Sequence, residues 1–146
     1  MTEGVRAAVD ALLSEWAWHI DHDDVAALMG LFTDDARYVA GRVSLQGKGE
    51  IEERYRARNR HGVRTTRHVY SGLRLTEVTP TTVRATSTWV CYAANAPSPV
   101  EGARVYLVAD FVDRLRRCAD GRWRLAERTI VDVFREPSLA PMSGPA

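Results

Sequence analysis

The stretch "RHVYSGLRLTEVTPTTVRATSTWVCYAA", residues 67–94, decides the fold of this chain. It holds two runs, 67–78 and 82–94, that are rich in valine, threonine and aromatic residues, and only "TPT" separates them. Such runs favour β-strands, and a short turn between them joins neighbouring strands into an antiparallel hairpin. Two similar runs follow at 103–116 and 122–134, after "NAPSPVEG" and "ADG". The second half of the chain is therefore predicted to form an antiparallel meander of four long strands.

Helices are predicted for most of the first third of the chain, where apolar residues recur at helical spacing. The apolar face of the first helix is formed by Val5, Val9, Leu12, Leu13, Trp16 and Ile20. A second helix over 25–32 is capped by Asp23 or Asp24, a short strand is expected at 36–41, a hairpin or turn at 41–49, and a mostly polar third helix at 49–60. Helices before a long meander predict an α+β fold, with the helices on one face of a curved antiparallel sheet.

Composition excludes several classes of function. The 146 residues are 45% hydrophobic and 27% charged, with a formal net charge of +1, as is normal for a globular domain. Neither a basic stripe for nucleic acid nor an apolar run of the ~20 residues needed to span a membrane is present in the sequence. Glu3 and Asp10 argue against a signal peptide, and Cys91 and Cys118 show no metal or disulfide spacing. We therefore expect a cytoplasmic protein.

The alternation of residues along the strands predicts which side chains face the helices. Trp89 and Cys91 share the apolar parity of their strand, so they are expected to point inward. The strand with His68 has conflicting parity, and His68 faces inward only if a bulge near 71–72 switches the face. The strand 103–116 is apolar on both faces, which suggests a homodimer or a higher homo-oligomer.

Asp21 and His68 are the candidate catalytic pair. A carboxylate at the end of the first helix can orient an imidazole and stabilise its protonated form, so that His68 acts as a base near neutral pH. The competing interpretation is that Asp21 is a helix cap and His68 a hydrogen-bonded core residue. His19 and His22 have a spacing that suits a metal but lack a second cluster of ligands, and Cys91 is an alternative nucleophile.

Aromatic residues are candidates for lining a cavity, although such residues more often serve as core. Those with suitable positions are Trp16, Tyr38, Tyr55 and Trp89.

Several motifs resemble the SnoaL-like family of the nuclear transport factor two-like superfamily. The stretch "HIDHDDVAALMGLFTDDARY" is similar to its helix signature, "SLQGKGEIEERY" to its Gly-x-x-x-Ile helix, "TRHVYSGLRL" to its Thr-x-His strand and "DGRWRLAERTI" to its closing strand. The resemblance implies a cone-shaped curved antiparallel sheet wrapped around N-terminal helices, a cystatin-like α+β barrel. It implies one SnoaL-like domain over 1–135, followed by a flexible tail, 136–146, rich in proline, serine and alanine.

The most similar subgroup contains scytalone dehydratase, bile acid 7α-dehydratase and hexachlorocyclohexane dehydrochlorinase. The resemblance implies an Asp–His dyad at Asp21 and His68 that works without metal or cofactor. It also implies substrate-binding residues at the positions Trp16, Tyr38, Tyr55, Trp89, Cys91 and Arg128. Trp16 replaces a tyrosine that assists in some dehydratases, and a second strand histidine has no counterpart here. The donor of a proton to a leaving group is left open between Tyr38, Tyr55 and protonated His68.

The expected activity is that of a cofactor-independent lyase or isomerase acting on a small hydrophobic molecule, such as a polyketide, terpenoid or steroid. Arg128 is expected at the rim of the pocket, where it would stabilise an oxyanion. One alternative is a non-catalytic ligand carrier or partner subunit, similar to the β chain of ring-hydroxylating dioxygenases. Another is a cyclase or epoxide hydrolase on the same fold, for which Asp110 and Asp132 are the further carboxylates available.

Overall fold

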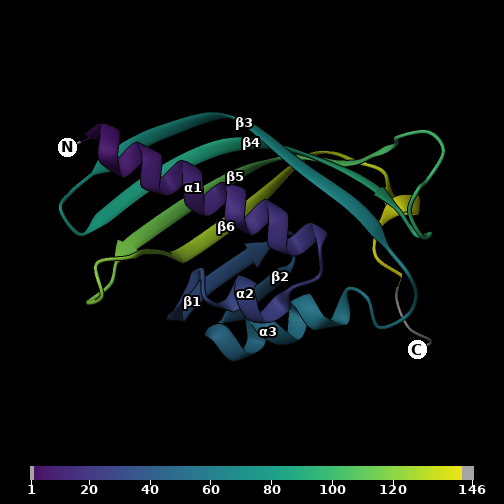
Figure 1. Ribbon diagram of the computed structural model, residues 1–146, viewed down its shortest axis with the longest axis horizontal. Coiled ribbons are helices and arrows are strands. Elements are labelled where there is room, and N and C mark those ends of the chain that lie inside the picture. Colours follow the sequence, from purple (N-terminus) through teal and green to yellow (C-terminus); the bar gives the residue numbers. More distant parts are fainter. Residues whose placement is uncertain (1, 143–146) are drawn as a thin grey trace.

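A computed structural model describes residues 2–142 of the chain (Figure 1). Its elements are α1 (Thr2–Asp21), α2 (Val25–Met29), β1 (Phe32–Ala40), β2 (Val43–Gln46), α3 (Lys48–Ala57), β3 (Thr65–Val78), β4 (Thr82–Ala94), β5 (Val105–Arg117), β6 (Trp123–Arg135) and the 3-10 helix η1 (Pro137–Leu139). The predicted α+β class and the four long strands are confirmed. Figure 1 shows α1 lying across the long strands, with α2 and α3 beside β1 and β2.

The strands form a six-stranded sheet in the order β2-β1-β6-β5-β4-β3. The sheet is curved around the helices but not closed, because β2 and β3 remain as its two edges. Every neighbouring pair is antiparallel except β1 and β6, which run parallel. The antiparallel arrangement predicted for the meander is confirmed, and the sequence did not predict the parallel pair. The long connection from β1 to β6 permits parallel pairing, whereas the hairpins of the meander impose the antiparallel arrangement.

The second helix is shorter than its apolar periodicity predicts. Helix α2 ends at Met29, and Phe32, the last position of the predicted helix, is already the first residue of β1. Phe32 is fully buried and pairs with Leu125 of β6. Pairing with a neighbouring strand has overridden the local helical pattern, because burial in the core is available to Phe32 in either conformation.

A bulge in β3 resolves the conflicting parity of this strand, as predicted. The register with β4 shifts between Ser71 and Arg74, and Gly72 adopts a left-handed conformation with φ of 63°. Glycine accepts this conformation without steric cost, and the extra residue switches the face of the strand. His68 therefore faces inward before the bulge and Leu73 after it, while Val69 is 53% exposed.

The core beneath α1 is an aromatic cluster that surrounds a buried ion pair. Trp16 of α1 packs edge-on against Trp89 and Phe111, with ring centroids 5.1 Å and 5.5 Å away. Arg128 and Asp113 are register partners on β6 and β5, and two hydrogen bonds of 2.8 Å join their side chains. The guanidinium carbon of Arg128 lies 4.7 Å from the centre of the Trp16 ring and 4.6 Å from that of Phe111. The charge is thus buried against aromatic faces and neutralised by one carboxylate.

Part of the predicted tail, 136–146, packs on the body of the protein. Arg64 donates a hydrogen bond of 2.7 Å to the carbonyl of Leu139, and Asn95 donates one of 2.9 Å to that of Ala140. Residues 143–146 lie outside the described residues. The division into a domain at 1–135 and a flexible tail stays a prediction. No helix within residues 2–142 has the length and hydropathy needed to cross a membrane.

We predict that Asp113→Ala lowers the free energy of unfolding by about 3–5 kcal/mol, because it leaves the buried guanidinium of Arg128 without its counter-charge. Urea denaturation followed by circular dichroism measures the change. Asp110→Ala is the matched control, since Asp110 lies on the same strand with an exposed side chain. It should alter stability by less than about 0.5 kcal/mol. Equal effects of the two substitutions would show that the ion pair does not stabilise the fold.

Candidate active site

The carboxylate of Asp21 is anchored by three hydrogen bonds from β3. Asp21 is the last residue of α1, and Asp24 then caps α2 by accepting a bond of 3.1 Å from the backbone of Ala27. Asp21 Oδ1 accepts from the Thr66 hydroxyl at 2.8 Å, and Oδ2 accepts from the backbone N–H of His68 at 2.9 Å. The third bond joins Oδ1 to Nδ1 of the His68 imidazole at 2.7 Å. The pair predicted from the sequence is therefore in direct contact.

This contact determines the tautomer of His68. A carboxylate can only accept, so the proton of the neutral imidazole lies on Nδ1, which leaves the lone pair of Nε2 available. Nε2 makes no hydrogen bond within the described part of the chain, and the His68 side chain lines a cavity. The ring packs edge-on against Trp16 with centroids 5.2 Å apart. The imidazole is thus held rigidly, with one nitrogen free to accept a proton.

Burial keeps this imidazole neutral. The His68 side chain is only 10% exposed, and desolvation lowers its pKa below the ordinary value of 6.5. The hydrogen bond and the negative charge of Asp21 raise the pKa but do not overcome the effect of burial. At neutral pH the side chain is therefore unprotonated, which is the state that a general base requires.

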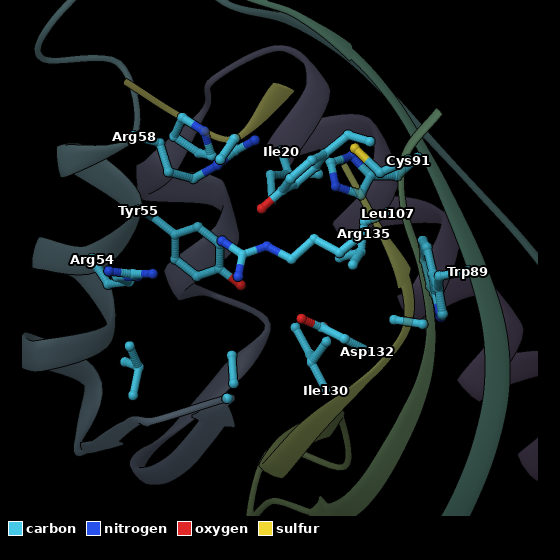
Figure 2. Close-up of a pocket in the computed structure, with 18 of the residues that line it drawn as sticks. Ile20, Arg54, Tyr55, Arg58, Trp89, Cys91, Leu107, Ile130, Asp132 and Arg135 are labelled. Atoms are coloured by element: carbon cyan, nitrogen blue, oxygen red, sulfur yellow. The ribbon is translucent and has the colours of Figure 1, made fainter. Parts of the chain in front are cut away.

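A cavity of about 750 Å³ lies between the helices and the concave face of the sheet (Figure 2). This volume suits a molecule of two to four fused rings, since small-molecule sites commonly enclose ~300–1,000 Å³. Among the residues proposed from the sequence, those that line it are Trp16, Tyr38, Tyr55, His68, Trp89 and Cys91. Asp21 lies behind His68 and is not part of the wall.

The two tyrosines of the wall are neutral hydrogen-bond donors. Both are buried, and desolvation raises the pKa of Tyr38 and raises that of Tyr55 well above its ordinary value. Trp16 Nε1 donates a bond of 3.0 Å to the Tyr55 oxygen, and a hydrogen bond from Tyr55 partly offsets the effect of burial on the pKa of Tyr38. A phenol held in this way can donate a hydrogen bond to a substrate oxygen.

Cys91 is a buried thiol and not an activated nucleophile. Burial raises the pKa of its thiol to about 11, so the thiolate is scarce at neutral pH. Cys91 is the register partner of His68 on β4, and both side chains face the cavity. Its contribution to the site is therefore apolar surface next to the imidazole.

The expectation that Arg128 lies at the pocket rim is wrong. Arg128 is fully buried, bonded to Asp113, and does not belong to the residues that line the cavity. The adjacent inward positions on β6, Ile130 and Asp132, line the cavity instead. Arg128 therefore belongs to the core beneath the cavity. A buried charge needs a buried carboxylate as its partner, whereas a charge at a solvated rim does not.

Several residues of the cavity mouth were not singled out from the sequence. They are Arg42, Arg54, Arg58, His61, Arg64 and Arg135, whereas Asp132, which also lines the cavity, was considered as a further carboxylate. Figure 2 shows Arg54 of α3 and Arg58, which directly follows α3, on one side of the cavity and Arg135 extending towards them from β6. For α3 a signal existed, since Arg54 and Arg58 fall at helical spacing on the face of the buried Ile51 and Tyr55.

The histidines considered for a metal site have protein partners. His19 Nε2 lies 2.9 Å from Glu15, and His22 Nδ1 lies 2.7 Å from the carbonyl of Trp18. Residues 2–142 contain no group of three or more His, Cys, Asp or Glu side chains placed to hold a metal ion.

A curved, open sheet around three helices, with an Asp–His pair beside the cavity, defines a class of small α+β proteins. The chain belongs to the SnoaL-like domain family, whose family model matches residues 5–129. No curated protein sequence matches the chain significantly.

Solved structures share this fold. One comes from Novosphingobium aromaticivorans, and its title assigns it provisionally as a scytalone dehydratase. It is 17% identical to this chain, with a TM-score of 0.80, and the match covers 100% of this chain and 95% of that chain. A second, from the same organism, is provisionally titled the β subunit of an aromatic-ring-hydroxylating dioxygenase; it is 22% identical, with a TM-score of 0.78 over 96% and 97%. A cystatin-like protein of unknown function from Nostoc punctiforme is 22% identical, with a TM-score of 0.71 over 92% of each chain. At these identities the similarity shows the fold alone.

We predict that His68 titrates below pH 6.5 in the folded protein, because burial lowers its pKa. Histidine ring resonances followed by NMR across pH measure this value. Asp21→Asn should lower the pKa of His68 further, because the bond and charge of Asp21 raise it. Substitution of Asp34, an exposed acid outside the site, is the control and should leave the resonance unchanged. A pKa above 6.5 would contradict the described balance of burial and charge.

Proposed function

We propose that the chain is a cofactor-independent lyase or isomerase in which His68 removes a proton from a carbon next to an activating group. The observation that carries this proposal is the 2.7 Å contact of His68 Nδ1 with Asp21, combined with an Nε2 that faces a cavity of about 750 Å³. A base needs a free lone pair, a suitable pKa and room for substrate, and His68 has all three.

In the proposed reaction, Nε2 takes the proton and the electron pair of the broken C–H bond moves into the neighbouring carbonyl group as an enolate. Asp21 stabilises the imidazolium that forms, through the bond at Nδ1 and through its negative charge. In an isomerisation the imidazolium returns the proton to a different carbon. In a dehydration the enolate expels the leaving hydroxyl group, which the imidazolium protonates so that water leaves.

Tyr38 and Tyr55 take the role that the sequence assigned to Arg128. Their pKa values are raised by burial, so they remain protonated and can donate hydrogen bonds to a developing oxyanion. Both line the cavity. Trp16, Trp89 and Phe111 provide the apolar wall on which a flat ring system packs, which supports a polycyclic polyketide, terpenoid or steroid as the substrate class.

The alternative of an epoxide hydrolase or cyclase has less support from the placement of carboxylates. Asp132 lines the cavity, whereas Asp110 is exposed and lies outside the lining. A hydrolase that activates water with several carboxylates would need more than the one acid that faces the cavity.

A second candidate function is that of a partner subunit, and one surface favours it. Val69, Val90, Val108 and Phe134 are register partners across β3, β4, β5 and β6, and together they form an apolar row. Val69 and Phe134 are 53% and 69% exposed. Such a row suits a second copy of the chain or a larger subunit. Association is compatible with catalysis, so only the loss of turnover on substitution of His68 separates the two functions.

We predict that His68→Gln lowers kcat by about 10²–10⁴-fold, the usual contribution of a general base. The measurement is the conversion of polycyclic β-hydroxy and β,γ-unsaturated ketones, with deuterium incorporation from solvent detected by mass spectrometry. His19→Gln is the matched control, because His19 pairs with Glu15 outside the cavity. Circular dichroism checks that both variants fold. Turnover that survives in His68→Gln would exclude His68 as the base.

The pH dependence of kcat/KM provides a separate prediction. Protonation of His68 removes the base, so kcat/KM should fall on the acid side and stay level through neutral pH. Because burial lowers the pKa of His68, the apparent pKa of this fall should lie below 6.5. A fall with an apparent pKa above 6.5 would contradict the assignment of His68 as the base.

A further inference from the structure

The open end of the cavity carries an excess of positive charge. Five arginines line the cavity, and within residues 2–142 Asp132 is the single carboxylate among the lining residues. The arginines are Arg42, Arg54, Arg58, Arg64 and Arg135. The chain as a whole has a net charge of only +1, so the charge at this mouth is local and not a reflection of composition. Such a concentration of one sign raises the local concentration of anions.

The arginines at the C-terminal end of α3 and in the turn after it differ in their partners. Arg56 and Arg60 are not among the residues that line the cavity, and they pair with Glu52 and Glu53 at 3.5 Å and 2.7 Å. Arg54 and Arg58 line the cavity, and neither makes an ion pair with any of the described residues. Arg135, opposite them on β6, also has no carboxylate partner within 2–142. Glutamates therefore neutralise Arg56 and Arg60, whereas the arginines that line the cavity are available to bind an anion.

Arg64, at a more buried position, also makes no ion pair with the described residues. Its Nη1 is bonded to Asn95 and to the carbonyl of Leu139, and its guanidinium lies 5.2 Å from the centre of the Tyr106 ring. The buried Nε has no hydrogen-bond partner in the described part of the chain. A buried donor without a partner is costly, and a bound ligand or water would satisfy it.

We propose that the substrate carries an anionic group, a carboxylate or a phosphate, that binds Arg54, Arg58 and Arg135 at the mouth of the cavity. This inference rests on the proposed function for the position of the reacting carbon. The guanidinium groups match the geometry of such anions and form charge-assisted hydrogen bonds with them. The apolar body of the substrate then extends along Trp16 and Trp89 towards His68.

The arrangement gives one cavity both an apolar surface and a cationic surface. The aromatic residues provide apolar surface beside the neutral base, and the arginines fix the orientation of the molecule. The positive charges also act at a distance on His68: burial is the main cause of the lowered pKa of His68, and Arg58 and Arg64 lower it further. The same field favours the negative charge that develops when a proton is removed from carbon.

Binding of matched naphthalene probes tests the proposal. 2-Naphthoate, 2-naphthyl phosphate and the neutral 2-naphthamide share one ring system and differ in the polar group. We expect at least one of the anions to bind about tenfold more tightly than the amide, measured by tryptophan fluorescence and calorimetry. Raising the salt concentration should weaken binding of the anion and leave binding of the amide unchanged. The tighter of the two anions identifies the natural group as carboxylate or phosphate. Equal or absent binding of all three would overturn the proposal.

Substitutions assign the effect to the mouth. Arg54→Gln, Arg58→Gln and Arg135→Gln should each weaken binding of the preferred anion by about five- to tenfold without changing the affinity for the amide. Arg56→Gln and Arg60→Gln remove the same charge from the outer face of α3 and are the matched controls. Losses of equal size in the controls would mean that only the net charge of the protein matters, which would overturn the assignment.

The same titrations in His68→Ala separate this inference from the proposed function. The anion preference should persist there, because the arginines do not contact His68 through any bond described. If His68 is essential for turnover but the anion preference is absent, the inference about the substrate fails and the proposed reaction stands. If the anion preference is present but turnover survives without His68, the proposed reaction fails and the binding site stands.

Discussion

The hydrogen bonds to Asp21 are the interaction on which the site depends. They join the end of α1 to β3, and they engage Thr66 and His68, which alternate onto the same face of the strand. Since the same carboxylate holds both the backbone and the ring of His68, the position of the imidazole is fixed together with the packing of α1 on the sheet. The bulge at Gly72 then returns the rest of β3 to the core. A change at Asp21 therefore affects both the position of the His68 imidazole and the stability of the fold.

Charged and titratable groups in and around the cavity occur in three different environments. In the core beneath the cavity, Arg128 is neutralised by Asp113 and covered by aromatic rings. In the cavity wall, burial keeps His68 uncharged despite its carboxylate neighbour, as its lowered pKa indicates. At the mouth, arginines face the cavity without carboxylate partners among the described residues. A low-dielectric interior tolerates the first two arrangements, and only the solvated mouth tolerates unpaired cations, so this distribution follows from desolvation.

The sequence predicted what short-range chemistry determines. Strand composition and turns located the meander, helical periodicity located α1 and α3, and the parity conflict located the bulge in β3. It did not predict the parallel pairing of β1 with β6, because partners distant in the chain leave no local pattern. Arg128 was misplaced for a related reason. The local sequence does not distinguish a buried arginine from one at the rim, and only the strand register shows that Asp113 is the partner of Arg128. The mouth arginines were missed because a polar helix face is usually solvated, although Ile51 and Tyr55 mark the face on which two of them lie.

Fold alone does not distinguish a catalytic member of this family from a structural one, because function resides in the site. A chain that only supports a partner gains nothing from an open cavity, and filling it with side chains would add burial and dispersion contacts. Here the cavity is kept, its wall holds an imidazole with a free nitrogen, and its mouth holds cations that repel one another when no ligand is present. Each of these features lowers stability relative to a packed core. Their presence together supports the proposal of a ligand that binds at the mouth and reacts at His68.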